Sequence, residues 1–382
     1  MRVIAAPNAF KGCLSAGQAA EAIRRGVLKA CPQSDVLCVP VADGGDGLLE
    51  VAVEALHGEI CEVVVKGPRM VDHPSSFGWI ATTRVAVIEM ANASGLTLVQ
   101  EGERDPAETS TLGTGQLIRA ALDKGAEKII VGLGGSATCD GGIGMAAALG
   151  YRFLDRNGAE IHPIGKSLQS IAAIDTTRVD SRLSRVVFQG VCDVTNPLTG
   201  KDGASYVYSP QKGATVEQVE QLDAGLANLA EVILRDMDME VRHLQGGGAA
   251  GGLGAGLYCF VGALLEKGID VVIDLVDLKT KIQGANLIIT GEGQIDHQTR
   301  FDKAPAGVAK VAQHNKIPCI AVCGSVGDGI EELYDIGICS VFSICPGPIS
   351  LAEAMADGFT LLEDRVEQVM RTYGAAHLYS ES

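Results

Sequence analysis

Apolar residues at the two ends of the chain alternate between short strand-like runs and longer amphipathic stretches. The strand-like runs cover residues 3–6, 36–41, 287–290, 318–323 and 340–344. The clearest helix start is Ser15, because Gln18 follows three residues later as a capping-box partner, and we expect this helix to run to about Ala30. Five short strands separated by helices are typical of a doubly wound parallel sheet, so the pattern predicts an α/β fold.

The middle of the chain has a different pattern. It contains a β-branched run at 129–131, a second strand-like run at 186–194, and two glycine-rich stretches at 132–144 and 245–256. A chain of 382 residues is too long for one ordinary core. We therefore expect residues 65–282 to form a mixed α/β domain inserted into a first domain made of residues 1–64 and 283–382. The active site would lie where the strand ends of both domains meet.

The stretch 132–144 is the most informative part of the sequence. It places six glycines between a strand-like run and a helix-like segment that begins near Met145. Glycine allows backbone N–H groups to converge on one anion, and the following helix adds the positive end of its dipole. This pattern predicts a phosphate-binding loop, assisted by the second glycine cluster. The candidate phosphate-binding residues are Gly134, Gly135, Ser136, Thr138, Gly247 and Gly248.

Acidic residues follow three of the predicted strands, where parallel sheets place their ligands. Asp43 and Asp46 lie in an Asp-Gly-Gly-Asp-Gly motif, Asp193 follows the run 186–192, and Glu292 and Asp296 follow the run 287–290. Carboxylates in such places bind Mg²⁺ or accept a hydroxyl proton. We expect Asp193 to be partly desolvated. The alternative for the Asp43 motif is a solvated turn, because Asp-Gly is common in turns. For Asp193 it is an Asx-type turn before Pro197, and for Glu292 and Asp296 it is a position at the surface.

Two lysines lie close to these acids in the sequence. Lys11 follows the first strand, and Lys303 follows the pair formed by Glu292 and Asp296. Each is a candidate for neutralising a phosphate or a carboxylate of a substrate. An ordinary solvated lysine is the alternative for Lys11.

Composition excludes several classes of partner. The formal net charge of −16 argues against nucleic acid and against anionic membranes. Residues 246–265 carry no charge, but eight of them are glycines, so a membrane-spanning helix is not expected. The eleven cysteines show no metal-ligand spacing and suggest buried, reduced thiols in the cytoplasm. A homo-oligomer is left open.

A dehydrogenase is the main alternative. Residues 132–137 match the dinucleotide pattern G-x-G-x-x-A, and Asp155 falls near the distance expected for a ribose-binding acid. Such a protein would use NAD(P) to oxidise a small hydroxy acid. However, Gly141, Gly142 and Gly144 would then occupy the first turns of the helix, where each costs roughly 1 kcal/mol relative to alanine. The helix should therefore begin later, and a long loop suits a triphosphate better.

Seven segments of the sequence, in order, resemble the bacterial glycerate kinases that yield 2-phosphoglycerate. They are residues 6–16, 42–47, 89–96, 110–115, 129–144, 192–197 and 291–296. The resemblance implies ATP- and Mg²⁺-dependent phosphorylation of D-glycerate to 2-phospho-D-glycerate, in glyoxylate or sugar-acid catabolism. It also implies a flavodoxin-like domain with a second mixed α/β domain inserted. The choice of the 2-hydroxyl comes from the resemblance alone, and 3-phosphoglycerate is the alternative product.

Within that chemistry, the candidate residues take definite roles as a hypothesis. Asp193 would hold Mg²⁺ together with Glu292 or Asp296. Lys303 and Lys11 would neutralise the γ-phosphate or the glycerate carboxylate. Asp43 is the first choice to accept the proton of the attacking hydroxyl, and Asp193 is the second. Asp46 would contact the substrate.

Overall fold

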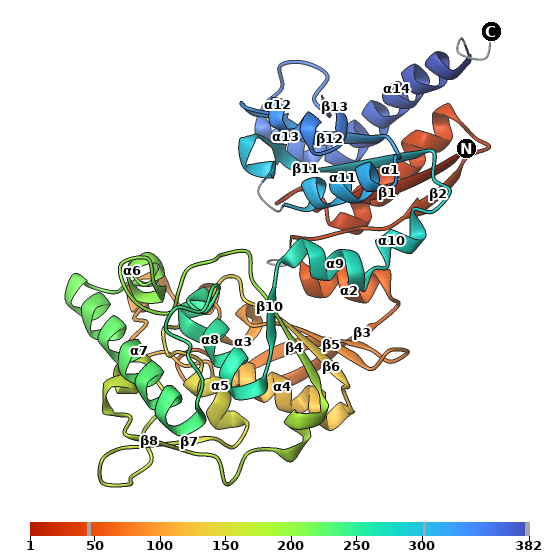
Figure 1. Cartoon of the computed structure of the whole chain (residues 1–382). Coiled ribbons are helices and arrows are strands. Elements are labelled where there is room, and N and C mark those ends of the chain that lie inside the picture. The colour runs from red at the N-terminus through yellow and green to blue at the C-terminus, as the bar shows by residue number, and fades with distance from the viewer. Residues whose placement is uncertain (44–46, 301–302, 379–382) are drawn as a thin grey trace. The chain divides into compact units, whose positions relative to one another are not determined.

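The computed structural model describes residues 1–43, 47–300 and 303–378, and its chain forms two compact units (Figure 1). Unit 1 comprises Met1–Asp43, Glu54–Leu56 and Ile269–Ser382, and unit 2 comprises Gly44–Val53 and His57–Gly268. Relative to the predicted division at 64/65 and 282/283, the segments 44–53 and 57–64 belong with unit 2. Residues 269–282 belong with unit 1.

The sheet of unit 1 contains five strands, all parallel. They are β1 (Arg2–Pro7), β2 (Asp35–Cys38), β11 (Leu287–Ile295), β12 (Cys319–Val326) and β13 (Ile338–Ser343). Their order is β13-β12-β11-β1-β2. This is the 2-1-3-4-5 order of the flavodoxin-like fold. The predicted α/β class with a doubly wound parallel sheet is confirmed, as are all five strands of the pattern.

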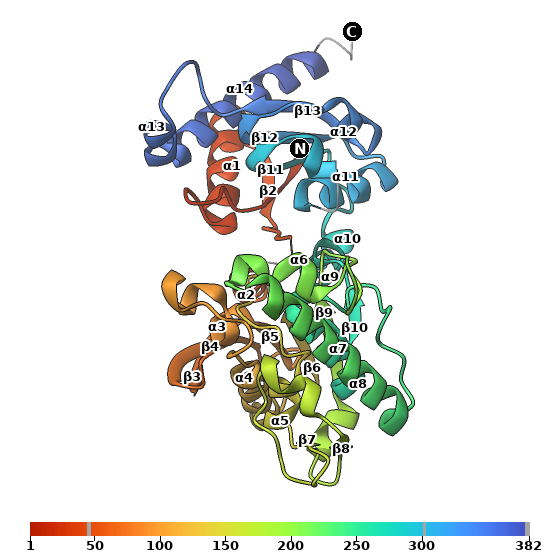
Figure 2. The same ribbon diagram turned by 90° about the vertical axis from the view of Figure 1, so that its left-hand side faces the viewer.

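Helices cover both faces of this sheet (Figure 2). One face carries α1 (Ala16–Ala30), α13 (Leu351–Ala356) and α14 (Gly358–Leu378), and the other carries α11 (Ala304–His314) and α12 (Glu331–Asp335). Ser15 and Gln18 form the predicted capping box at the start of α1. Two further helices, α9 (Gly268–Leu275) and α10 (Leu278–Lys281), precede β11.

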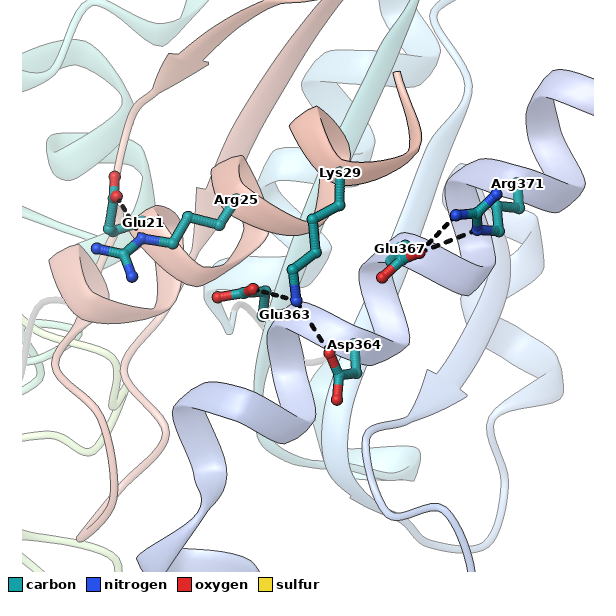
Figure 3. A network of polar contacts seen from close by, with 7 residues as sticks. All are labelled: Glu21, Arg25, Lys29, Glu363, Asp364, Glu367 and Arg371. Atoms are coloured by element: carbon teal, nitrogen blue, oxygen red, sulfur yellow. Dashed lines mark hydrogen bonds and ion pairs between the residues drawn. The ribbon is translucent and has the colours of Figure 1, made fainter. Parts of the chain in front are cut away.

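Helices α1 and α14 pack against each other and join the two ends of the chain in one unit (Figure 3). Gly26 permits this close approach, because a Cβ atom there would lie 2.8 Å from the Cβ of Val366. At the surface, Lys29 forms ion pairs with Glu363 and with Asp364, the latter at 3.3 Å. Exposed ion pairs of this kind contribute little each. The apolar contact therefore does most to hold α14 in place.

Unit 2 has a mixed sheet of six strands in the order β10-β9-β6-β5-β4-β3. The strands β5, β6, β9 and β10 run parallel, while β3 and β4 form an antiparallel hairpin at one edge. A separate antiparallel pair is formed by β7 and β8. The bounds are β3 (Glu59–Lys66), β4 (Asp72–Ile80), β5 (Val85–Glu89), β6 (Lys128–Gly132), β7 (Arg152–Leu154), β8 (Ala173–Asp175), β9 (Val187–Val191) and β10 (Leu264–Glu266).

The helices of unit 2 enclose its main core around α4, α5, α7 and α8. The helices of this part of the chain are α2 (Leu48–Ala55), α3 (Ala91–Ser94), α4 (Leu112–Lys124), α5 (Ile143–Ala148), α6 (Ala204–Tyr208), α7 (Val216–Met237) and α8 (Ala249–Val261). The last residues of α2 belong to unit 1. Short 3₁₀ turns lie at Leu96–Leu98, Glu101–Glu103, Gly165–Ser170, Ser181–Arg185, Pro210–Lys212 and, in unit 1, His297–Arg300.

The uncharged stretch 246–265 forms the predicted glycine loop followed by a buried helix. Ala250, Gly251 and Gly252 have left-handed backbone conformations, so the regular part of α8 begins after them. Among the described helices, none combines the length and the apolar character needed to cross a bilayer. The eleven cysteines all lie in the described residues and all are free, but only four are buried and Cys339 is exposed.

Candidate active site

Asp43 lies at the start of helix α11 in unit 1. Its Oδ2 accepts a hydrogen bond of 3.0 Å from the Asn8 side-chain amide, and its Oδ1 accepts the backbone N–H of Ala304. A carboxylate is favoured here because the first N–H groups of a helix lack partners within the helix. Burial raises the pKa of Asp43, whereas the Ala304 N–H, the Lys303 charge and the Asn8 amide act to lower it. The carboxylate is thus held in one orientation by two donors.

Glu292 on β11 is the second buried acid of this cluster. It is only 6% exposed, and its Oε1 accepts a hydrogen bond of 2.8 Å from the Thr299 hydroxyl. Burial raises the pKa of Glu292 to about 7; the Lys303 charge opposes this shift, and the negative charge of Asp43 adds to it. The structure therefore brings together three predicted residues, Asp43, Glu292 and Lys303.

Asp296 lies beyond the end of β11 and is partly exposed. Its two oxygens accept hydrogen bonds from the Gln298 backbone N–H, at 2.8 Å, and from the Gln294 side chain, at 3.1 Å. Lys11 is exposed, and its backbone nitrogen lies 3.4 Å from the position that a Cβ on Gly293 would take. Lys11 thus occupies the loop beside the end of β11.

Asp46 lies outside the described residues, as do the two glycines before it. The next residue of the motif is described. Gly47 donates its N–H to Glu89 Oε1 at 3.0 Å, and Leu49 donates to the same oxygen at 3.0 Å. Glu89, at the end of β5, therefore caps the start of α2.

The glycine loop of unit 2 runs from the end of β6 at Gly132 to the start of α5 at Ile143. Helix α5 begins after Gly141 and Gly142, as predicted, but Gly144 lies in its first turn, so the prediction is wrong for that glycine. Asp140 fixes the end of this loop, because its fully buried carboxylate accepts four hydrogen bonds. They come from the Thr111 N–H (2.7 Å), the Thr111 hydroxyl (2.8 Å), the Gly142 N–H (3.0 Å) and the Gly144 N–H (3.2 Å).

The two glycine-rich stretches pack directly against each other. Gly141 donates its N–H to the Gly251 carbonyl at 3.0 Å. A Cβ on Gly251 would lie 1.9 Å from the Thr138 carbonyl oxygen, and one on Gly142 would lie 2.9 Å from the Gly256 Cα. Several of these glycines are therefore required for close packing of backbone on backbone. The interpretation of all of them as phosphate ligands is too broad.

The second cluster has its N–H groups engaged as well. Gly247 donates to the Leu244 carbonyl at 2.9 Å, and Gly248 donates to the Asn196 carbonyl at 3.0 Å. In contrast, the backbone N–H groups of Gly134, Gly135 and Ser136 have no acceptor among the described residues. The same is true of the Thr138 N–H, so the candidates that keep an N–H group without an acceptor in the described part of the chain are Thr138 and the segment 134–136.

This segment lines a pocket of about 390 Å³ that lies entirely within unit 2. Its lining combines apolar side chains with the glycine loop, Asp193 and Lys212. The lining residues are Leu96, Leu133, Gly134, Gly135, Ser136, Val191, Cys192, Asp193, Val194, Tyr208, Gln211, Lys212, Ala249 and Ala250.

Sequence reasoning missed Lys212. This lysine is only 2% exposed, and its ammonium group donates to Ser136 Oγ at 2.7 Å and to the Thr138 carbonyl at 2.8 Å. Burial lowers the pKa of Lys212 to about 8, and the charges of Cys139 and Asp140 oppose the shift. No local signal identifies this residue, because it is a single lysine in a short turn far from the loop in sequence. Thr138 itself is fully buried, and its Oγ1 has no partner among the described residues.

Asp193 lines the same pocket, but the prediction that it is partly desolvated is wrong. The strand β9 ends at Val191, and residues 193–195 are exposed. Asp193 Oδ1 accepts the Gly268 N–H at 2.8 Å, which orients the carboxylate.

No described residues form a group of three or more His, Cys, Asp or Glu side chains arranged to hold a metal. Asp193 belongs to unit 2, while Glu292 and Asp296 belong to unit 1. The donors nevertheless fit Mg²⁺, which prefers carboxylate oxygens. Burial of Glu292 close to Asp43 disfavours a second negative charge, and a divalent cation would favour it.

The chain closely resembles proteins of known kind. The sequence profile of the glycerate kinase family matches residues 3–374. The chain is 47% identical over 363 residues to a glycerate kinase of Bacillus subtilis (strain 168), covering 95% of each chain. It is 43% identical over 359 residues to glycerate 2-kinase of Escherichia coli (strain K12), covering 94% of each. The solved structure of a putative glycerate kinase 2 from Salmonella typhimurium LT2 matches with a TM-score of 0.92 and 44% identity, covering 99% of each chain.

These matches, with the α/β fold and the pocket beside a glycine loop, define the class of the protein as a kinase. More narrowly, the chain belongs to the glycerate kinase family. The dehydrogenase alternative is therefore wrong. Asp155, its proposed ribose-binding acid, instead closes a turn by accepting the N–H groups of Asn157 and Ala159, and it does not line the pocket of the glycine loop.

Proposed function

We propose that the protein transfers the γ-phosphoryl group of ATP to the 2-hydroxyl of D-glycerate, giving 2-phospho-D-glycerate. The observation that carries this proposal is the pocket in unit 2. Three consecutive backbone N–H groups without protein acceptors lie at its wall, and this is a suitable nest for a phosphate. Membership of the glycerate kinase family supplies the acceptor.

The nucleotide is assigned to this pocket for two reasons. Its volume of about 390 Å³ is much larger than a three-carbon acid needs. Its apolar and aromatic lining residues, which include Leu96, Val191 and Tyr208, suit the adenosine part of ATP. Gly134, Gly135 and Ser136 would bind the phosphates through N–H groups. Gly247 and Gly248 would then shape the loop, because their N–H groups are engaged, and Thr138 remains a predicted phosphate contact.

The cluster in unit 1 is assigned to glycerate and to proton transfer. Asp43 is the first choice for the group that accepts the hydroxyl proton, since two donors hold its carboxylate in place. Lys303 and Lys11 would neutralise the carboxylate of glycerate or the transferred phosphoryl group. Asp193 remains the second choice as base, and Asp46 remains a predicted substrate contact.

Mg²⁺ is part of the proposal, held by Asp193 with Glu292 or Asp296. When bound, it would neutralise charge on the oxygens of the transferred phosphoryl group. The protein's own share of the work is to position the nucleotide through amide groups and to keep Asp43 and Lys303 oriented. In a phosphoryl transfer this positioning accounts for most of what a protein contributes.

Two finer points belong to the same proposal. The choice of the 2-hydroxyl follows the relative from E. coli named glycerate 2-kinase. A cytoplasmic location is proposed because eleven free thiols, one of them exposed, suit a reducing compartment.

Phosphorus NMR tests the reaction directly. The protein is incubated with ATP, Mg²⁺ and D-glycerate, and the product is compared with authentic 2- and 3-phosphoglycerate. Matched samples lack glycerate or Mg²⁺. We expect the 2-phosphate ester to form only in the complete mixture. Formation of the 3-phosphate would correct the regiochemistry, and ADP without any phosphoglycerate would refute the function.

A further inference from the structure

Lys212 is a buried cation without a direct counter-ion. Among the described residues, no carboxylate forms an ion pair with its ammonium group, whose recorded partners are Ser136 Oγ and the Thr138 carbonyl. Both partners are neutral, and an ammonium group has three donors. Burying such a charge is costly unless an anion compensates for it. The arrangement therefore leaves one N–H and most of the positive charge available at the pocket wall.

The position of Lys212 relates this charge to the glycine loop. Lys212 lines the pocket together with Gly134, Gly135 and Ser136, whose N–H groups lack protein acceptors. Ser136 Oγ accepts from Lys212, so the serine keeps its own hydroxyl proton for another acceptor. Backbone amides, a hydroxyl and an ammonium group thus line one wall of the pocket, and a phosphate is the ligand that satisfies all three kinds of donor.

A purely structural role for Lys212 would be to tie the loop to the turn at Pro210–Lys212. A neutral donor would serve that purpose without the cost of burying a charge. A nearby negative charge also favours the charged form of Lys212. Asp140, fully buried at the end of the same loop, acts on Lys212 through its negative charge. Asp140 is itself satisfied by its four donors, which leaves the ammonium group to a ligand.

We propose that Lys212 is a phosphate-binding residue that contacts the nucleotide in the pocket of the glycine loop, with Ser136 as its partner. This proposal rests on the proposed function, because it takes ATP as the ligand of that pocket. It adds a residue that sequence reasoning did not identify. The phosphate would then be bound by backbone amide groups together with one buried ammonium group, and not by amide groups alone.

Calorimetric titration with two probes tests the role of Lys212. The non-hydrolysable ATP analogue AMP-PNP carries the phosphates, and adenosine lacks them. We expect Lys212→Met to weaken AMP-PNP binding by about 10- to 100-fold, the size of one charge-assisted hydrogen bond, and to leave adenosine binding unchanged. In kinetics, KM for ATP should rise while KM for glycerate stays constant. The control is Lys201→Met, since Lys201 lies outside the pocket with its ammonium group 4.9 Å from the Tyr206 ring.

The outcomes separate the two proposals. If the wild type forms no phosphoglycerate and binds no AMP-PNP, the proposed function fails. If the wild type is active and Lys212→Met binds AMP-PNP as tightly as the wild type, the role of Lys212 is refuted.

Loss of Lys212 leaves the Asp140 charge without support, so folding needs its own control. Lys212→Gln keeps a neutral donor for Ser136 Oγ and the Thr138 carbonyl and should show the same loss of AMP-PNP binding, while circular dichroism checks that both variants are folded.

Discussion

Replacing Asp140 with alanine gives the sharpest test of how the glycine loop is held. The substitution leaves four buried donors without an acceptor, three backbone N–H groups and one hydroxyl. Each unsatisfied buried donor costs about 1–3 kcal/mol, but removing a desolvated carboxylate recovers several kcal/mol. The expected net loss is about 3–5 kcal/mol in the free energy of unfolding of unit 2.

The more conservative variant Asp140→Asn should lose less. An amide oxygen placed where Oδ2 now lies keeps the hydrogen bonds to Thr111 and Gly144, and only the Gly142 N–H loses its acceptor. The expected cost is about 1–3 kcal/mol. Which variant loses more unfolding free energy is as informative as the size of each loss. Both variants remove the charge, but only Asp140→Ala removes all four hydrogen bonds, so the comparison distinguishes loss of hydrogen bonds from loss of charge.

The assay is urea denaturation followed by tryptophan fluorescence. Trp79 is the single tryptophan of the chain and lies in the core of unit 2, so it reports on that unit. The control is Asp123→Ala, which removes an exposed carboxylate paired with Arg182 at 2.8 Å and should cost no more than about 1 kcal/mol. If Asp140→Ala were no less stable than Asp123→Ala, the loop would not depend on this carboxylate and the reasoning would fail.

Three further predictions concern unit 1. Asp43→Asn should lower kcat by about 100-fold or more while AMP-PNP affinity is retained, and an unchanged kcat would remove Asp43 as the base. Lys303→Ala should raise KM for ATP or glycerate by about 10-fold or more; unchanged kinetics would place this lysine outside the site. For Glu292→Gln, the difference in unfolding free energy from the wild type depends on pH. The folded-state pKa of Glu292 is about 7, above its ordinary value of 4.5, so wild-type stability relative to the variant falls as pH rises through this interval. The total change is about 3 kcal/mol without Mg²⁺, measured by circular dichroism, and a constant difference would contradict the raised pKa.

Local signals in the sequence predicted the elements of the fold well. The capping box at Ser15 and Gln18 involves residues three apart, and the five strands of unit 1 are short apolar runs between turn residues. The start of α5 after Gly141 and Gly142 also followed from local energetics, since helices disfavour glycine. Gly144 lies in the first turn all the same, because a Cβ there would lie 2.2 Å from Ser110 Oγ. Strand β3 belongs to unit 2 because it pairs with β4, and pairing between strands leaves no local signal in the sequence. The boundary between the units near residue 57 therefore differs from the predicted boundary at 64/65.

The site was predicted less completely because its determinants are distant in sequence. Asp43, Glu292 and Lys303 come together because parallel strands end at one edge, which the pattern of strands made foreseeable. The packing of Gly251 on Thr138 joins segments more than a hundred residues apart, so glycines needed for packing resembled phosphate ligands. Lys212 reaches the loop from a separate turn, and no spacing rule could have placed it there.

The order of strands in unit 1 has a consequence for the newly made chain. Strand β1 is paired on one side by β2 and on the other by β11, which is synthesised only after all of unit 2. The first 43 residues therefore leave the ribosome with one sheet edge open, and they must wait for more than two hundred further residues before that edge is covered. Unit 2 has all its strands by residue 266 and can complete its fold in the meantime. Helix α14 is synthesised after the strands of both sheets, so a chain that stops before residue 358 lacks the helix that packs against α1.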